Sequence, residues 1–357
     1  MSCPSRNEPG FPMLGSATVS FSAFRPALFT LDPERAHRLA LDAARLYGHL
    51  PGRSLAGPAV NLMGLRFPNR LGLAAGFDKN AEALDGLGKL GFGFIEVGTV
   101  TPRSQPGQSR PRLFRLPKSG ALINRLGFPN HGAAAVARRL RRRRYGGIVG
   151  VNIGKNADTP IDQALDDYIL CFRAVCDTAD YIAVNVSSPN TASLRDLHRP
   201  ERLEPLLTAL MSERGRISHE LHRHIPIVLK ISPDLDFDSL KEIAGIALRI
   251  SLDGIIATNT SIRRDDPMIG DAGSQDGGLS GAPLFQVSLK TVSCLRRLLG
   301  PAFPIIGVGG VDSPDKARAM RAAGADLVQI LTGMIYRGPS LVAECVRALR
   351  GAGVTAE

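Results

Sequence analysis

Hydrophobic positions in this chain fall into short, β-branched runs from about residue 70 onward. A polar or glycine-rich turn and a stretch with helical spacing follow each run. The runs are 71–76, 92–99, 147–154, 180–188, 226–232, 253–260, 304–310 and 326–333. Strands that are apolar along their whole length indicate a parallel sheet covered on both faces. Eight strand–helix units within about 260 residues predict an α/β fold, a closed (β/α)8 TIM barrel. An open, doubly wound sheet is the alternative.

The pattern before the barrel is helical rather than β-like. Asp32 followed by Pro33 is a typical helix start, with an N-cap and then a proline in the first turn. Apolar residues then recur on one face, at Ala36, Leu39, Ala40, Ala43, Leu46 and Tyr47. Residues 21–50 therefore predict two amphipathic helices, which either pack on the barrel or attach it to one face of a membrane. We divide the chain into residues 1–52, a loose N-terminus (1–20) plus this helical extension, and residues 53–357, the catalytic barrel.

Charge and cysteine content narrow the function classes. Lys and Arg number 44 against 33 Asp and Glu, a net charge of +11, which attracts anions. The run RRLRRRR (138–144) lies in a helical stretch and reads as a solvated basic face or an aid to anionic-lipid binding. Aromatic residues are only 5% and Trp is absent, so we expect no nucleic-acid partner. Five scattered Cys without a CxxC motif predict no disulfide framework, and His, Asp and Glu spacing predicts no metal.

The sequence pattern predicts neither a membrane-spanning segment nor a signal peptide. No apolar stretch reaches the roughly 18–20 residues that cross a bilayer. The N-terminus lacks a basic segment followed by an apolar one and a cleavage site. We therefore expect a protein that is soluble or attached to one membrane face.

Polar residues gather where the predicted strands end, which is where barrel enzymes place their chemistry. These residues are Gly76, Asp78, Lys79, Glu96, Thr99, Asn152, Lys155, Asn185, Ser188, Asn190, Lys230, Thr258, Asn259, Thr260, Gly309, Gly310, Thr332 and Gly333. A single polar residue at a strand end is explained by an ordinary turn, but so many of them at the same end of the barrel predict a functional site. Asn and Thr suit an amide-rich planar heterocycle, and Lys suits an anion. Glycines after the last two strands are typical of a phosphate site. Together they indicate flavin mononucleotide (FMN).

A long Pro- and Gly-rich stretch, residues 100–130, follows the second predicted strand. Long insertions at this face of a barrel are often lids or substrate loops. Arg103, Arg110, Arg112 and Arg115 make it basic, which fits an anionic substrate or a gating role.

The ordered motifs resemble class 2, quinone-dependent dihydroorotate dehydrogenase from about residue 24 to the C-terminus. They are AAGFDKN, EVGTVTPRSQPGQSRPRLFRL, INRLGF, VNIGKN, NVSSPNT, ATNT, GGLSG and IIGVGG. The resemblance implies oxidation of (S)-dihydroorotate to orotate in de novo pyrimidine biosynthesis, with FMN as hydride acceptor and ubiquinone as final acceptor. It also implies peripheral attachment to the cytoplasmic face of the bacterial inner membrane. Surface lipids would then be partners, and no obligate protein partner is expected.

The resemblance also assigns residues. Flavin contacts would be Ala75, Gly76, Phe77, Asp78, Lys79, Thr99, Asn152, Asn185, Lys230, Thr258, Gly281, Gly310, Leu331 and Thr332. Substrate contacts would be Lys79, Asn124, Arg125, Leu126, Gly127, Phe128, Asn185, Asn190, Asn259 and Thr260. Ser188 matches the base that takes the C5 proton while hydride leaves C6 for the flavin, and Thr191 is the candidate proton relay. His37 and Arg115 match residues of the quinone tunnel.

Two details distinguish this chain from class 1 dehydrogenases and from many relatives in the resembled family. Class 1 dehydrogenases use a Cys base and lack the N-terminal helices, whereas no Cys here lies at a strand end, which favours class 2. Leu331 stands where many relatives have Tyr. Ser187 should point away from Ser188 because side chains alternate along a strand, so we expect a structural role for it.

Overall fold

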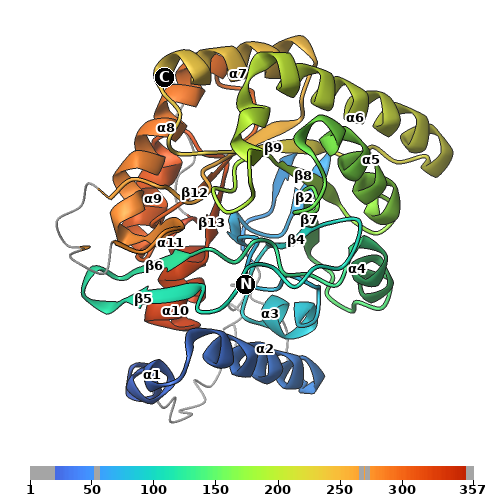
Figure 1. Ribbon diagram of the computed structural model, residues 1–357. Coiled ribbons are helices and arrows are strands. Elements are labelled where there is room, and N and C mark those ends of the chain that lie inside the picture. The colour runs from blue at the N-terminus through green and yellow to red at the C-terminus, as the bar shows by residue number, and fades with distance from the viewer. Residues whose placement is uncertain (1–20, 52–56, 265–268, 270–273, 351–357) are drawn as a thin grey trace, which may run out of the picture.

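Eight parallel strands close into a barrel at the centre of the molecule (Figure 1). The computed structural model describes residues 21–51, 57–264, 269 and 274–350. In barrel order the strands are β3 (Leu71–Leu73), β4 (Phe94–Val100), β7 (Ile148–Ile153), β8 (Tyr181–Asn185), β9 (Ile227–Ile231), β10 (Gly254–Ala257), β12 (Ile305–Val308) and β13 (Leu327–Ile330). β13 pairs with β3 and closes the ring. Each strand falls within one predicted run, except that β4 ends one residue beyond its run, at Val100. The closed barrel is confirmed, and the open sheet was wrong.

Helices surround the barrel and bury its outer face (Figure 1). They are α3 (Leu84–Lys89), α4 (Ala133–Leu140), α5 (Ala164–Val175), α6 (Pro200–Leu221), α7 (Phe237–Arg249), α8 (Phe285–Leu299), α9 (Pro314–Ala322), α10 (Thr332–Arg337) and α11 (Ser340–Ala348). Short 3₁₀ turns occupy Pro117–Ser119, Ile161–Gln163, Leu194–His198 and Ala282–Leu284. Side-chain caps start two of the helices, Asp236 on α7 and Ser313 on α9. Hydrophobic contact between helices and strands makes the larger core.

A second, smaller core fills the barrel interior. It is closed at the amino end by the hairpin of β1 (Val60–Leu62) and β2 (Leu65–Phe67). Phe67 packs edge to face on Phe94, the first residue of β4, with ring centroids 5.4 Å apart. The amino end is therefore filled with apolar side chains, which leaves the carboxyl end as the open mouth.

The Pro- and Gly-rich stretch after β4 is more ordered than a loop. Strands β5 (Leu113–Leu116) and β6 (Ala121–Asn124) form an antiparallel hairpin. Strand β6 also pairs with β11 (Gly278–Gly281). The turn needs a left-handed residue, which Gly120 supplies at φ 58°. This three-stranded sheet was not predicted, because its strands are short and surrounded by turn residues.

The basic run lies at the end of α4 and beyond it, not wholly in a helix. Arg141 and Arg143 bind Asp177 and Asp180, at 2.7 and 3.0 Å, and Arg144 binds Asp85 at 3.1 Å. These carboxylates neutralise much of the run, which favours the interpretation as a solvated basic face.

The N-terminal extension consists of α1 (Phe21–Thr30) and α2 (Pro33–His49), which lie together beside the barrel mouth (Figure 1). Asp32 accepts hydrogen bonds from the backbone N–H groups of Glu34 and Arg35, so the predicted helix start is confirmed. Several large apolar side chains of the extension are exposed, at Phe24, Leu31, Leu39, Leu46, Tyr47 and Leu50. Within the part of the chain that the structure describes, none of the helices combines the length and the hydrophobicity that a transmembrane span requires. Residues 1–20 and the predicted boundary at 52–53 lie outside the described residues.

Candidate active site

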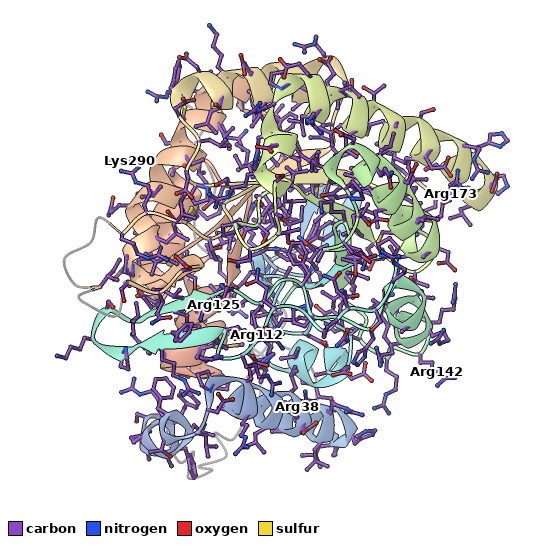
Figure 2. All side chains as sticks on the ribbon, viewed as in Figure 1. Arg38, Arg112, Arg125, Arg142, Arg173 and Lys290 are labelled. Carbon is purple, nitrogen blue, oxygen red and sulfur yellow. The ribbon has the colours of Figure 1, made fainter. Side chains whose placement is uncertain are left out.

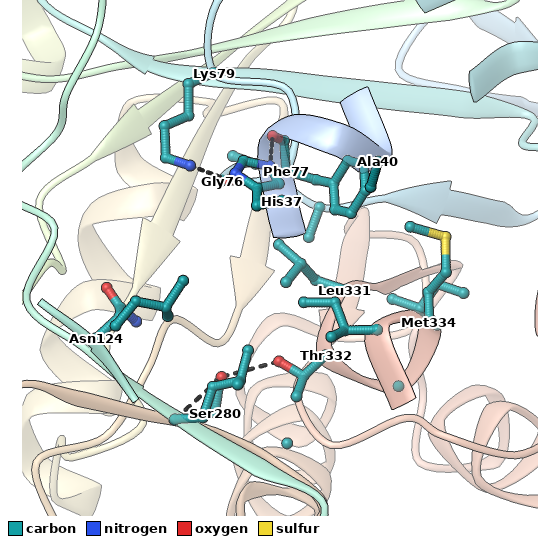
Figure 3. A pocket seen from close by; sticks show the side chains of 18 of the residues that line it. His37, Ala40, Gly76, Phe77, Lys79, Asn124, Ser280, Leu331, Thr332 and Met334 are labelled. Atoms are coloured by element: carbon teal, nitrogen blue, oxygen red, sulfur yellow. Dashed lines mark hydrogen bonds between the residues drawn. The ribbon is translucent and has the colours of Figure 1, made fainter. Parts of the chain in front are cut away.

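A cavity of about 720 Å³ extends from the barrel mouth to the space beneath α1 and α2 (Figure 3). Its wall contains most of the residues that the sequence placed in a site. From the flavin set these are Ala75, Gly76, Phe77, Lys79, Thr99, Asn185, Lys230, Thr258, Gly281, Gly310, Leu331 and Thr332. From the substrate set they are Asn124, Leu126, Gly127, Phe128, Asn190, Asn259 and Thr260, together with Ser188. His37 and Arg115 line the same cavity. The fold thus brings together residues separated by up to about 300 positions.

Four predicted site residues lie outside the cavity wall. The carboxylate of Asp78 accepts hydrogen bonds from the backbone N–H groups of Glu82 and Ala83 and so orders the turn before α3. Arg125 donates to the carbonyl of Pro111 and stacks on Phe114. Two others are buried behind the wall, Asn152 and Thr191.

A buried ion pair lies at the base of the polar end. Lys230 Nζ is 3.2 Å from Glu96 Oε1, and both side chains are almost fully buried. Glu96 also accepts from the amides of Asn152 (2.8 Å) and Gln329 (2.7 Å) and from the hydroxyl of Tyr181 (3.1 Å). All the donors come from barrel strands, so Lys230 is held in place by the barrel itself.

Glu96 was predicted only as one of the polar strand-end residues, without a role of its own, and Gln329 and Tyr181 were not among the predicted site residues. A signal was available, because a carboxylate within the apolar strand FIEVGTV must have partners when it is buried. The partner could not be read from the sequence, since Lys230 lies 134 residues away.

The side chain of Lys79 is a cation that forms no ion pair with a carboxylate among the described residues. Its ammonium group donates to the carbonyl of Gly76 at 2.6 Å (Figure 3). Burial, as the main cause, lowers the pKa of Lys79 to about 8. A desolvated cation in a cavity wall favours an anionic ligand there.

The segment after β8 divides its side chains between the cavity and the barrel. Ser188 lines the cavity, and its Oγ accepts a hydrogen bond from the backbone N–H of Asn190. Ser187 is fully buried; its hydroxyl binds Asn185 Oδ1 (3.0 Å) and accepts from Asn259 Nδ2 (2.8 Å). Its burial is compatible with the expected structural role, since the hydroxyl fixes two amides that face the cavity.

The comparisons with known proteins fit this geometry. A sequence model described as dihydroorotate dehydrogenase matches residues 58–351. The chain belongs to this family. Its relatives include the dihydroorotate dehydrogenase (quinone) of Aromatoleum aromaticum, 51% identical over 92% of this chain and 94% of the relative. The enzyme of the same name from Leptothrix cholodnii is also 51% identical, over 94% of this chain and 100% of its own length.

Solved structures agree with the sequence relatives. The crystal structure of dihydroorotate dehydrogenase from Eimeria tenella with ferulenol has a TM-score of 0.85 and 38% identity, and covers 91% of this chain and 93% of its own. The ligand-free form of that protein has a TM-score of 0.83 and 39% sequence identity, and covers 89% of this chain and 94% of its own. This member of the dihydroorotate dehydrogenase family thus shares its overall fold with experimentally determined structures.

Dihydroorotate dehydrogenases are generally flavin-dependent, and the cavity residues fit such a group. At Gly76 (φ 110°) an added Cβ would meet only Leu331, at 3.5 Å, so a side chain there would occupy cavity space. Gln329 lines the cavity and its buried Oε1 has no hydrogen-bond partner among the described residues. Glycine backbone, neutral amides and lysines match the phosphate and amide edges of FMN.

At the apolar end, His37 and Arg115 join the extension to the barrel. The neutral ring of His37 donates from Nε2 to the carbonyl of Phe77 at 2.7 Å (Figure 3). Burial lowers the pKa of His37 to about 3, so the ring is uncharged at neutral pH. Arg115 donates to the carbonyl of Leu31 and stacks on Phe29.

Proposed function

We propose that this protein oxidises (S)-dihydroorotate to orotate, with FMN as hydride acceptor and ubiquinone as final electron acceptor, in de novo pyrimidine biosynthesis. One observation carries the proposal beside the relatives' names: a single cavity joins a polar end, lined by amides and Lys79, to an apolar end roofed by α1 and α2. A charged substrate and an apolar acceptor could use its opposite ends.

The polar end supplies the residues that would hold cofactor and substrate. When bound, FMN supplies a two-electron acceptor for the hydride. The flavin set named above would hold it, with Gly281, Gly310 and Thr332 on the phosphate side. Lys230 would place positive charge beside it. Lys79 would bind the substrate carboxylate, and Asn124, Asn190 and Asn259 would bind the ring amides. In this proposal Asn152 supports the set by holding Thr99, while Asp78 and Arg125 order the surrounding turns.

Ser188 is the proposed base for the C5 proton. A hydroxyl is a weak base, so it needs a desolvated position and a group that receives its proton. Ser188 is only 5% exposed. Thr191, buried behind the wall, is the proposed relay, with a water between the two hydroxyls.

The extension is proposed to bind the membrane and admit the quinone. Its exposed apolar side chains would enter the lipid surface, on the cytoplasmic face of the bacterial inner membrane. His37 and Arg115 would line the quinone path, and Leu331, in place of the Tyr of many relatives, would alter its shape. No nucleic acid and no obligate protein partner are part of this function.

Anaerobic flavin reduction tests the proposal. The purified protein should be yellow and should bleach when dihydroorotate is added. Ser188→Ala should keep FMN and lose most of the reduction rate, whereas Ser187→Ala should mainly lower stability, by about 1–3 kcal/mol for two broken buried hydrogen bonds. No bleaching of the wild type would refute the activity. A wild-type rate in Ser188→Ala would remove Ser188 as the base.

A further inference from the structure

We propose that Glu34, on the extension, acts through Arg112 as a positioning residue for the substrate end of the cavity. The inference rests on the proposed function, because it concerns the same site. It assigns a role to an ion pair that lies outside the cavity wall. It also predicts that the membrane-facing extension and the substrate pocket influence each other.

The first part of the connection joins α2 to the stretch before β5. Arg112 binds Glu34 with two hydrogen bonds, Nε to Oε1 at 2.7 Å and Nη2 to Oε2 at 3.1 Å. The Arg112 side chain is 8% exposed and that of Glu34 is 17% exposed. The hydrogen bond from Arg112 is the largest cause of the lowered pKa of Glu34. Such a bidentate, shielded pair has a fixed geometry, unlike an exposed pair. Figure 2 shows Arg112 next to the start of α2.

The second part joins Arg112 to the loop before it. The remaining terminal nitrogen, Nη1, donates to the carbonyls of Pro106 and Gln108, both at 2.7 Å. The planar guanidinium therefore holds the extension on one side and the loop on the other. A shift of α2 against the barrel would have to move this loop or break the pair.

The third part reaches the cavity wall. Gln108 donates from its side chain to the carbonyl of Asn190 at 2.6 Å, and from its backbone to the carbonyl of Leu126 at 3.0 Å. Asn190 and Leu126 line the cavity, and Asn190 also binds Asn124. A continuous set of hydrogen bonds thus runs from Glu34 to the proposed substrate contacts.

This connection changes what removal of the extension should do. Deleting residues 1–50 takes away Glu34 and leaves Arg112 without this partner. Reduction by dihydroorotate should then suffer in KM, in addition to the loss of reoxidation by ubiquinone. Because coupling between two binding events is reciprocal, a ligand in the substrate pocket should also stabilise the docking of α1 and α2.

The test uses the full-length, FMN-loaded protein with Glu34→Gln, which keeps the size of the side chain and removes its charge. Asp42→Asn is the matched control, since Asp42 pairs with Arg45 on the same helix and both are more than half exposed. We expect the orotate Kd and the dihydroorotate KM to rise about tenfold in Glu34→Gln, with kcat within about twofold and FMN retained. Arg112→Lys, which keeps the charge but loses the planar guanidinium and its two N–H donors to Glu34, should behave similarly.

Hydrogen exchange separates coupling from general loss of structure. In the wild type, orotate should slow exchange in residues 21–49, and in Glu34→Gln this protection should disappear while exchange in the barrel strands stays unchanged. Wild-type orotate affinity in Glu34→Gln, or equal protection in both proteins, would overturn the inference. If the wild type neither binds orotate nor is reduced by dihydroorotate, the proposed function fails instead.

Discussion

Replacing Lys79 with Met should stabilise the FMN-free protein while it abolishes tight orotate binding. Burial lowers the pKa of Lys79 from 10.5 to about 8, which corresponds to about 3 kcal/mol of unfavourable free energy for the charged form at neutral pH. Met has a similar volume and carries no charge. It loses the hydrogen bond to Gly76, worth about 1 kcal/mol. The net expectation at pH 7 is a gain of about 2 kcal/mol in the free energy of unfolding.

The pH dependence identifies the cause. Since the folded pKa of Lys79 lies below its unfolded value, the unfolded chain holds the extra proton between about pH 8 and 10.5. The wild type therefore pays the full cost of the buried charge below pH 8 and recovers stability as the pH rises through this window. The Met variant cannot titrate, so its advantage should shrink above pH 8 by about 1.4 kcal/mol per pH unit and reverse at about pH 9.5.

Urea unfolding of both FMN-free proteins at several pH values measures this difference from the midpoint, at constant m value. Lys290→Met, at an exposed position, is the control and should change stability by less than about 0.5 kcal/mol. In the FMN-loaded protein, Lys79→Met should weaken orotate binding by about 10- to 100-fold. A variant less stable than the wild type at pH 7, or a difference that does not vary with pH, would refute the reasoning.

Other substitutions probe the barrel and the extension. Glu96→Gln leaves Lys230 buried without its counter-charge and should lower the free energy of unfolding by about 3–5 kcal/mol, measured in urea. The control Glu220→Gln, which breaks an exposed pair, should lower it by less than about 1 kcal/mol. Equal effects of the two substitutions would contradict the buried-pair argument. Gly86→Ala should loosen the extension, because its Cβ would lie 1.7 Å from the carbonyl oxygen of Ala44. The melting temperature should fall in the full-length protein and stay unchanged in a protein lacking residues 1–50; a fall in both would place the strain inside the barrel.

Much of the fold followed from local pattern. The barrel strands are apolar throughout, and the start of α2 is marked by Asp32 and Pro33, so both could be located without tertiary information. The strand-end rule also found the cavity wall, because parallel strands deliver their carboxyl ends to one mouth.

The rule could not give the direction of each side chain. Asp78 and Lys79 are neighbours at the same strand end. The carboxylate of Asp78 binds backbone N–H groups, whereas the side chain of Lys79 lies in the cavity wall. Long-range pairs were equally out of reach: Glu96 with Lys230, and Glu34 with Arg112, join residues far apart in sequence. Such pairs depend on packing that no local spacing encodes.

The pairing of β6 with β11 has a consequence for the exchange of loops between barrels. The connections after β4 and after β10 share four backbone-paired positions, from Asn124 with Gly278 to Ala121 with Gly281. A foreign segment grafted after β4 alone would leave β11 as an unpaired edge beside the cavity. Specificity engineering in this protein should therefore transplant both connections as one unit, and natural variation in either should be matched in the other.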